Sequence, residues 1–534
     1  IRKEGGGVVV IGTTDPTSGG ANTGVDSIIG GKDNDYNAGS HCAIFGELNS
    51  KTGTDIQEGN HCLISGKDNF NNSGDYCIIG GDANTGNSGD YSAIFGRNNY
   101  GNTGDYCLIA GGGETPMDGH MSNSGDHCII GGEDNNTNSG DACIIGGNNN
   151  NINSGRKCII GGDNNNTNSG DECIIGGEDN RLNSGDACII GGLDNEYNSG
   201  DACSISGHGN QGNFGTHSTI GGKVASGSTK IVTSGTSAAA ATNLVTKTSH
   251  GVTVNQPLRF TTLTGGSYGL STSTTYYARD ILTDTFAVAL TPGGSAVTLT
   301  GNYTVANYIA NAVNYGNFST IAGEDNEGNS GSHCNISGDQ NYNNSGNSTS
   351  ISGAYNSSNS GNYSQISGSS NSSNTGNYSA IFGRSNWSNT GDYCLIAGGG
   401  TAMDGHRNNS GDGCIIGGED NHTNSGNYCI IGGDDIYDNS GDGCLIGGNS
   451  NDTNSGKDCI IGGDNNNNNS GDDCLIVGED NTYNSGDACI IGGSDNEGNF
   501  GTHSIIGGKV ASGSTRIATS GTSAEADDNL ITKS

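Results

Sequence analysis

The chain has 534 residues, of which 98 are glycine and only 30% are hydrophobic. Its formal net charge of −36 disfavours nucleic acid and anionic membranes as partners, because both repel an acidic surface. The sequence contains no run of about 18 apolar residues, so no membrane span is expected. Low apolar content with high charge is typical of disorder, but regular repetition lets each unit bury a small apolar face on its neighbours.

Residues 1–26 are predicted to be a lead-in, after which a repeat of 15 residues begins. A Cys marks each repeat, and we call its position the slot. If Ser or Thr is accepted in the slot, 13 repeats occupy residues 27–223 and 13 more occupy residues 317–509. The most regular run of slots is Cys128, Cys143, Cys158, Cys173, Cys188 and Cys203.

The repeat reads (Cys/Ser)-x-Ile-x-Gly, and it continues with Asn-Ser-Gly or Asn-Thr-Gly near its end. The alternation around Ile predicts a short strand, and the clusters of Gly, Asn and Ser predict turns. Strand and turns within 15 residues make one coil of a parallel β-solenoid, with coils about 4.8 Å apart. The predicted fold class is therefore all-β: a β-solenoid or β-roll that carries a small inserted all-β domain.

A second regular position is the Asn seven residues after the slot, which we expect to form a hydrogen-bonded ladder between coils. Its members include Asn135, Asn150, Asn165, Asn180 and Asn195. In three coils the residue seven positions after the slot is not Asn but Glu114, Thr401 or Ile436. Because only the slot and the next Ile face one side of the strand, the core is thin. We therefore predict that parallel copies of the chain associate as a homo-oligomer.

All 18 cysteines lie in the slot. Three interpretations apply to them: small buried side chains that line the core, disulfides between chains, or a site for a soft metal. Ser or Thr takes the slot in several coils, which favours packing, and no C-x-x-C pair occurs. Free thiols would suit assembly in a reducing compartment.

Three units carry a resemblance to a known family: SGDYSAIFGRNN at 88–99, SGNYSQISGSSN at 360–371 and TGNYSAIFGRSN at 375–386. They resemble the head repeats of YadA-like trimeric autotransporter adhesins, which form a left-handed parallel β-roll. They are also similar to repeats of phage tail-fibre and virion proteins. The resemblance implies a trimer, an elongated shape and a role in surface attachment.

Between the blocks, residues 224–243 are predicted to be a connector and residues 244–313 a small all-β module with strand patterns such as TFAVALT. Residues 510–534 repeat the connector and begin a second module. Insertions at 110–125 and 397–411 share Met-Asp-Gly-His and are expected to protrude as loops, where binding often resides. The candidate binding residues are Met117, Asp118, His120, Met403, Asp404 and His406; the alternative is simple duplication of the block.

Six histidines directly precede a slot and should point outward as surface residues: His41, His61, His127, His217, His333 and His503. The acidic turns do not reproduce a known calcium motif, so no metal or cofactor is assigned. No enzyme signature occurs either.

The predicted function is a structural fibre for surface attachment, most simply a phage or virus tail or virion fibre, located extracellularly or on a virion surface. A bacterial surface appendage or trimeric adhesin is the alternative, and a glycan-cleaving tailspike is a third reading. Expected partners are further copies of the chain, together with a cell-surface glycan or protein receptor.

Overall fold

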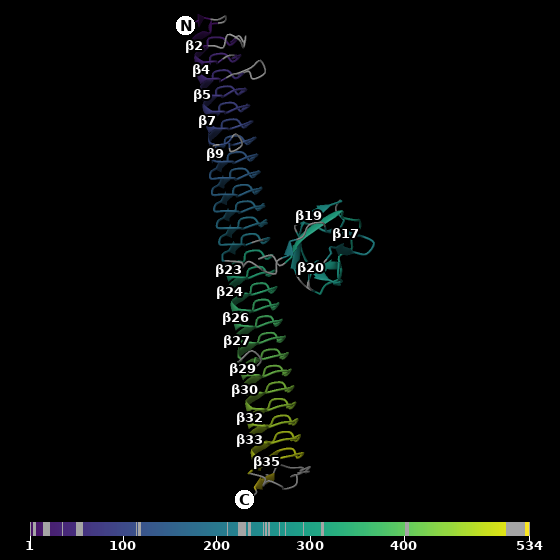
Figure 1. Cartoon of the computed structure of the whole chain (residues 1–534). Coiled ribbons are helices and arrows are strands. Elements are labelled where there is room, and N and C mark those ends of the chain that lie inside the picture. Colours follow the sequence, from purple (N-terminus) through teal and green to yellow (C-terminus); the bar gives the residue numbers. More distant parts are fainter. Residues whose placement is uncertain are drawn as a thin grey trace. The chain divides into compact units, whose positions relative to one another are not determined.

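The computed structural model describes residues 2–3, 7–13, 22–34, 36–49, 57–113, 115, 119–210, 212–222, 231–232, 236–248, 250, 252, 254, 257–265, 268–272, 274–291, 293–310, 314–400, 405–508 and 529–532. The chain divides into two compact units, Ile1–Ser226 and Gly227–Ser534 (Figure 1). Within the described ranges, no helix has the length and apolar character that crossing a bilayer requires.

The first unit is a ladder of short strands. From β2 to β15 each strand pairs in parallel with the next one along the chain, and Ile144 lies opposite Ile159. The strands are β1 (Arg2–Lys3), β2 (Val9–Thr13), β3 (Ile28–Lys32), β4 (Ala43–Glu47), β5 (Leu63–Lys67), β6 (Ile78–Asp82), β7 (Ala93–Arg97), β8 (Leu108–Gly111), β9 (Ile129–Gly132), β10 (Ile144–Ile145), β11 (Ile159–Ile160), β12 (Ile174–Ile175), β13 (Ile189–Ile190), β14 (Ser204–Ile205) and β15 (Thr219–Ile220).

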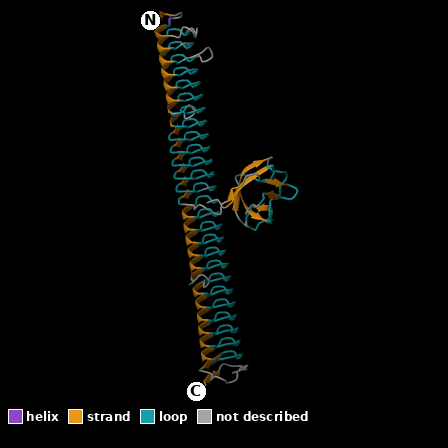
Figure 2. Cartoon of the chain, viewed as in Figure 1, coloured by secondary structure: helices purple, strands orange, loops and turns teal. Residues whose placement is uncertain are grey.

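The second unit contains an equivalent parallel ladder. Its strands are β23 (Thr320–Glu324), β24 (Asn335–Asp339), β25 (Ser350–Ala354), β26 (Gln365–Ser369), β27 (Ala380–Arg384), β28 (Leu395–Gly398), β29 (Ile415–Glu419), β30 (Ile430–Asp434), β31 (Leu445–Asn449), β32 (Ile460–Asp464), β33 (Leu475–Glu479), β34 (Ile490–Ser494), β35 (Ser504–Gly507) and β36 (Asn529–Thr532). In each block the strands line one side of the stacked coils and the turns form the rest (Figure 2). The predicted parallel β-solenoid is confirmed.

The second unit also contains the predicted small all-β module, as an antiparallel sheet in the order β16-β22-β19-β20-β21-β18-β17. Its strands are β16 (Ile231–Val232), β17 (Ser237–Ala239), β18 (Leu244–Thr246), β19 (Pro257–Thr264), β20 (Thr275–Arg279), β21 (Thr285–Ala289) and β22 (Val305–Ala310). A compact apolar core that includes Phe260, Tyr276 and Phe286 holds it together. β16 and β17 extend the sheet into residues 224–243, the stretch expected as a connector.

The core of one coil is small and partly polar. In the coil that begins at Cys143, the slot and Ile145 are buried at 2% and 3% exposure, while Ile144 between them is 46% exposed. Asn150 and Asn153 are also buried, at 0% and 2%. Apolar burial alone therefore cannot order a coil of this length, and the buried amides must supply the rest.

The Asn seven residues after the slot links three coils. The backbone N–H of Asn150 donates to Oδ1 of Asn135 at 2.8 Å, and its Nδ2 donates to the carbonyls of Gly146 and Gly162 at 2.8 and 2.7 Å. A second Asn column, ten residues after the slot, behaves in the same way: the N–H of Asn153 donates to Oδ1 of Asn138 at 2.9 Å. Both columns satisfy backbone groups that tight turns leave without partners.

Close contact with the next coil explains why two positions of each repeat are glycine. Gly147 has φ +93°, and a Cβ there would collide with the carbonyl oxygen of Gly162 in the next coil. Gly155, of the Asn-Ser-Gly motif, lies against the carbonyl of Gly170 and near Sγ of Cys158 in the same way. The recurring glycines therefore let successive coils approach to the distance of hydrogen-bonded strands.

The described cysteines are buried free thiols. Sγ of Cys143 donates to the carbonyls of Asp141 and Gly155 at 3.3 and 3.1 Å, and it accepts the N–H of Cys158 at 3.4 Å. Ser92 forms the equivalent bonds through Oγ, at 3.1 Å to the carbonyls of Asp90 and Gly104. The slot thus selects a small side chain that can donate, which explains why Cys and Ser interchange.

Electrostatics keep the thiol of Cys143 protonated at neutral pH. The hydrogen bond with the Cys128 side chain raises the pKa of Cys143 to about 11, and burial adds to the effect. Because each thiol is enclosed by its own chain, a bridge to a second chain would require the coil to open. Packing combined with hydrogen bonding is therefore the role that the geometry gives to the cysteines.

We predict that Cys143→Ala lowers the free energy of unfolding by about 1–3 kcal/mol, because the buried carbonyl of Gly155 loses its donor and the buried N–H of Cys158 loses its acceptor. Cys143→Ser keeps the donor and should cost less. Denaturant unfolding of both variants, with amide hydrogen exchange at Cys158, measures the difference. An alanine variant as stable as the serine variant would show that the slot requires small size alone.

Candidate functional site: an edge of carboxylates and stacked rings

The turn that precedes the slot forms one edge of the coil stack, with two regular rows of side chains. An Asp two residues before the slot and an aromatic residue one before it recur in adjacent coils, as in Asp75–Tyr76 and Asp90–Tyr91. We call this the Asp–ring edge. The exposed fractions of Tyr76, Tyr91 and Tyr106 are 48%, 51% and 55%, so the rings lie at the surface.

The rings stack on one another along the first block. Successive centroids are 4.5 to 5.0 Å apart and the planes are within 10° of parallel. The stack consists of His41, His61, Tyr76, Tyr91, Tyr106 and His127. In the second unit, Tyr363, Tyr378 and Tyr393 repeat the arrangement at 4.9 and 5.0 Å. Because neighbouring rings cover the faces, the row presents mainly ring edges to the solvent.

The backbone fixes both rows. Tyr91 has φ +54°, and its N–H donates to the carbonyl of Asp75 in the preceding coil at 2.8 Å. Oδ1 of Asp90 accepts the N–H of Asp75, and Oδ1 of Asp105 accepts the N–H of Asp90, both at 2.7 Å. Each carboxylate therefore ties two coils together. Partial burial and the neighbouring tyrosines raise the pKa of Tyr91, so its hydroxyl stays protonated at neutral pH.

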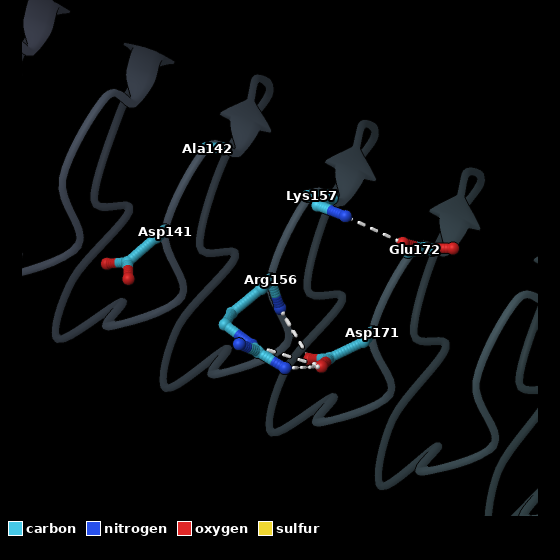
Figure 3. A pocket seen from close by; sticks show the side chains of 6 residues that line it. All are labelled: Asp141, Ala142, Arg156, Lys157, Asp171 and Glu172. Atoms are coloured by element: carbon cyan, nitrogen blue, oxygen red, sulfur yellow. Dashed lines mark hydrogen bonds and ion pairs between the residues drawn. The ribbon is translucent and has the colours of Figure 1, made fainter.

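The rows are interrupted at Ala142, where no ring fills the edge. A hollow of about 240 Å³ opens there, lined by Asp141, Ala142, Arg156, Lys157, Asp171 and Glu172 (Figure 3). Its two cations are already paired: Arg156 Nη2 lies 2.6 Å from Asp171, and Lys157 Nζ lies 2.8 Å from Glu172. Such exposed pairs contribute about 0–1 kcal/mol each. The hollow offers mixed charge and is not a site selective for anions.

The histidines of the two insertions do not lie where the sequence predicted. His120 and His406 are 0% exposed, so they do not sit on protruding loops. Each occupies the Asn column of the core, which simple counting had placed at Glu114 and Thr401. Those two residues, together with Met117, Asp118, Met403 and Asp404, lie outside the described residues.

Each buried His replaces an Asn in the ladder. The N–H of His120 donates to Oδ1 of Asn99, its Nδ1 accepts the N–H of Asn135 at 3.3 Å, and its Nε2 faces the carbonyl of Ala110 at 3.3 Å. His406 makes the equivalent contacts with Asn386, Asn421 and Ala397. These contacts place the ring proton on Nε2. Burial lowers the pKa of both histidines.

Sequence reasoning treated the residues before the slot as separate surface positions. All six outward histidines lie on exposed turns of described coils, as predicted. The missed signal was that Tyr, Phe and His share this position in successive repeats. Elsewhere in the described ranges, no group of three or more His, Cys, Asp or Glu side chains is arranged to hold a metal ion.

The pH dependence of stability follows from His120 and His406. Their folded pKa lies below the value of about 6.5 of an unfolded His, so the unfolded chain binds more protons below pH 6.5. Stability should be full above about pH 6.5 and fall as the pH drops toward the folded pKa. The double variant His120→Asn/His406→Asn restores the ladder residue and should flatten this dependence, measured by denaturant unfolding across that range. His217→Asn, at an exposed turn, is the control; an unchanged slope in the double variant contradicts the assignment.

No model of a known protein family matches the chain, and no curated protein matches its sequence. These comparisons assign no role to the Asp–ring edge. Its function must be argued from the geometry, which is a regular display of carboxylates, phenol groups and imidazoles at the spacing of stacked strands.

Proposed function

We propose that the protein is a structural element of a homo-oligomeric fibre, most simply a trimer, that mediates surface attachment. Within each block, the stacked coils give continuous hydrogen bonding along the chain, which suits a load-bearing element. The resemblance to YadA-like heads and to phage tail-fibre repeats supports this assignment. Among such fibres we favour a tail or virion fibre, exposed on a virion surface.

The observation that carries the proposal is an apolar stripe on the outer face of the strands. Isoleucines one residue after the slot are 46% to 55% exposed in five successive coils: Ile129, Ile144, Ile159, Ile174 and Ile189. In a chain of net charge −36, such a row is unusual for a surface that faces only water.

Glycines beside the stripe add an independent argument. A Cβ placed on Gly146, Gly161, Gly176 or Gly191 would meet nothing within 4 Å, and these residues do not need a positive φ. The fold of the chain itself therefore gives no reason for Gly directly after these strands, where its backbone freedom costs stability. Close approach of another backbone supplies that reason, and a parallel second copy matches the repeat spacing coil by coil.

The buried free thiols favour the virion over the secreted adhesin. Disulfide-forming compartments oxidise exposed cysteines during folding, whereas the cytosol keeps them reduced. A fibre with 18 slot cysteines is best assembled in the cytosol of an infected cell. The trimeric adhesin remains the second candidate because the repeats resemble that family.

We predict that Gly161→Val weakens assembly while leaving the coil intact, because its side chain has free space in the monomer but projects into the proposed contact. Sedimentation should give three times the chain mass for the wild-type protein and a lower mass for the variant. Ile152→Asp is the control, since Ile152 is 56% exposed at a turn away from the stripe. A wild-type monomer, or a variant that assembles normally, contradicts the proposal.

Immunogold labelling of the source cells and of the virus particles they release distinguishes the two candidates. Label on projections of the particles is the expected result. Label confined to the surface of uninfected cells would establish the adhesin and overturn the virion assignment.

A further inference from the structure

We propose that a row of side chains on the second block binds a neutral polysaccharide, through stacking on Trp387 and hydrogen bonds to the residues that follow it. This inference rests on the proposed attachment function and names the ligand class. The row consists of Trp387, Arg407, His422 and Tyr437. Parallel bridges join each member to the next, so the four residues occupy the same position in successive coils.

The residue types of the row are not explained by links between coils. In three coils of the first block the same position holds Asn136, Asn151 and Asn166, whose side chains accept the backbone N–H of the preceding coil at 2.5 to 2.6 Å. Asp452 does so in the coil after the row, at 2.7 Å. The side chains of Trp387 and Arg407 have no acceptor for such a bond, so this ladder does not account for them.

Three side chains of the row, those of Arg407, His422 and Tyr437, are held in place by their neighbours. Arg407 Nη2 donates to Asp420 at 2.7 Å, and the hydroxyl of Tyr437 donates to Asp435 at 2.7 Å while lying 3.2 Å from Asp420. The ring of His422 stacks on that of Tyr437 with centroids 3.8 Å apart. Asp420 therefore connects Arg407 to Tyr437, and the polar groups need little reordering to meet a ligand.

The chemistry fits a sugar polymer. Trp387 is the single Trp of the chain and is 47% exposed, so its indole offers an apolar surface to the C–H face of a pyranose. The adjacent carboxylates accept hydrogen bonds and the guanidinium donates them, which matches ligand hydroxyls. The four coils span about 14 Å in a straight line, which suits several units of a linear chain.

Charge selects a neutral ligand over an acidic one. The guanidinium of Arg407 is already engaged by Asp420, and Asp435 next to the row is exposed. The chain as a whole carries −36, so an anionic polysaccharide would meet net repulsion.

The single Trp makes the site directly observable. We expect its fluorescence to change when the full chain is titrated with short linear oligosaccharides of glucose, mannose, galactose or N-acetylglucosamine, and to stay constant with polygalacturonate. Calorimetry with the sugar that responds should show affinity at least about tenfold lower for Trp387→Ala. Tyr437→Phe, which keeps the ring and removes the hydroxyl, should weaken binding less than Trp387→Ala.

The matched control is Tyr100→Ala. Tyr100 occupies the equivalent position of the first block and is 56% exposed, but no Arg, His and Tyr follow it along the row. Its loss should leave affinity unchanged. Absence of binding to every neutral sugar, tighter binding of polygalacturonate, or full affinity in Trp387→Ala would each overturn the proposal.

The two measurements distinguish a wrong sugar site from a wrong assignment as a homo-oligomeric fibre. All residues of the row come from one chain, so a monomer in sedimentation would still bind sugar if the site is correct. A trimer that attaches to cells after periodate has destroyed their glycans would instead point to a protein receptor and contradict the sugar site.

Discussion

Hydrogen bonds between equivalent groups of successive coils are the interaction on which the rest of this structure depends. A coil of 15 residues has few apolar side chains to bury and many backbone groups to satisfy. Asn150 and Asn153 solve this locally, because the side-chain amide of each donates to a carbonyl of the next coil and accepts a backbone N–H of that coil. The Cys or Ser of the slot also donates to carbonyls and accepts a backbone N–H, through a smaller side chain.

The corners explain why the repeat tolerates so little change in length. Asn149, Ile152 and Lys157 all have φ between 56° and 58°, a conformation that costs a non-Gly residue about 1–2 kcal/mol. Each corner N–H donates to a carbonyl of the preceding coil at 2.8 to 3.0 Å. The strain is therefore offset by bonds between coils and not within one, so a single coil has no stable form of its own.

Much of this could be predicted from the sequence, because periodicity reports packing directly. The slot, the inward Ile and the first Asn column recur at fixed positions, and their placement in the core follows from strand alternation. The second Asn column was read only as part of a turn motif, since Asn is common in turns. His120 was misplaced because counting along the chain cannot show that the core position is resumed after the insertion. The ring stack was not predicted because only the histidines before the slot were considered, and not the Tyr and Phe residues that share their position.

The uniformity of the repeat also gives its exceptions meaning. Every coil packs in the same way. A residue whose type is not explained by the packing of the coils is therefore a candidate for contact with another molecule. Gly161 and its counterparts in neighbouring coils have room for a side chain they do not carry, and the proposed second copy of the chain would account for this. Trp387 and Arg407 occupy a position that Asn fills in three coils of the first block, and the proposed sugar ligand would account for them. The hydrogen-bonded ladder explains most residues of the repeat through stability. The residues that it does not explain are therefore the candidates for interaction with other molecules.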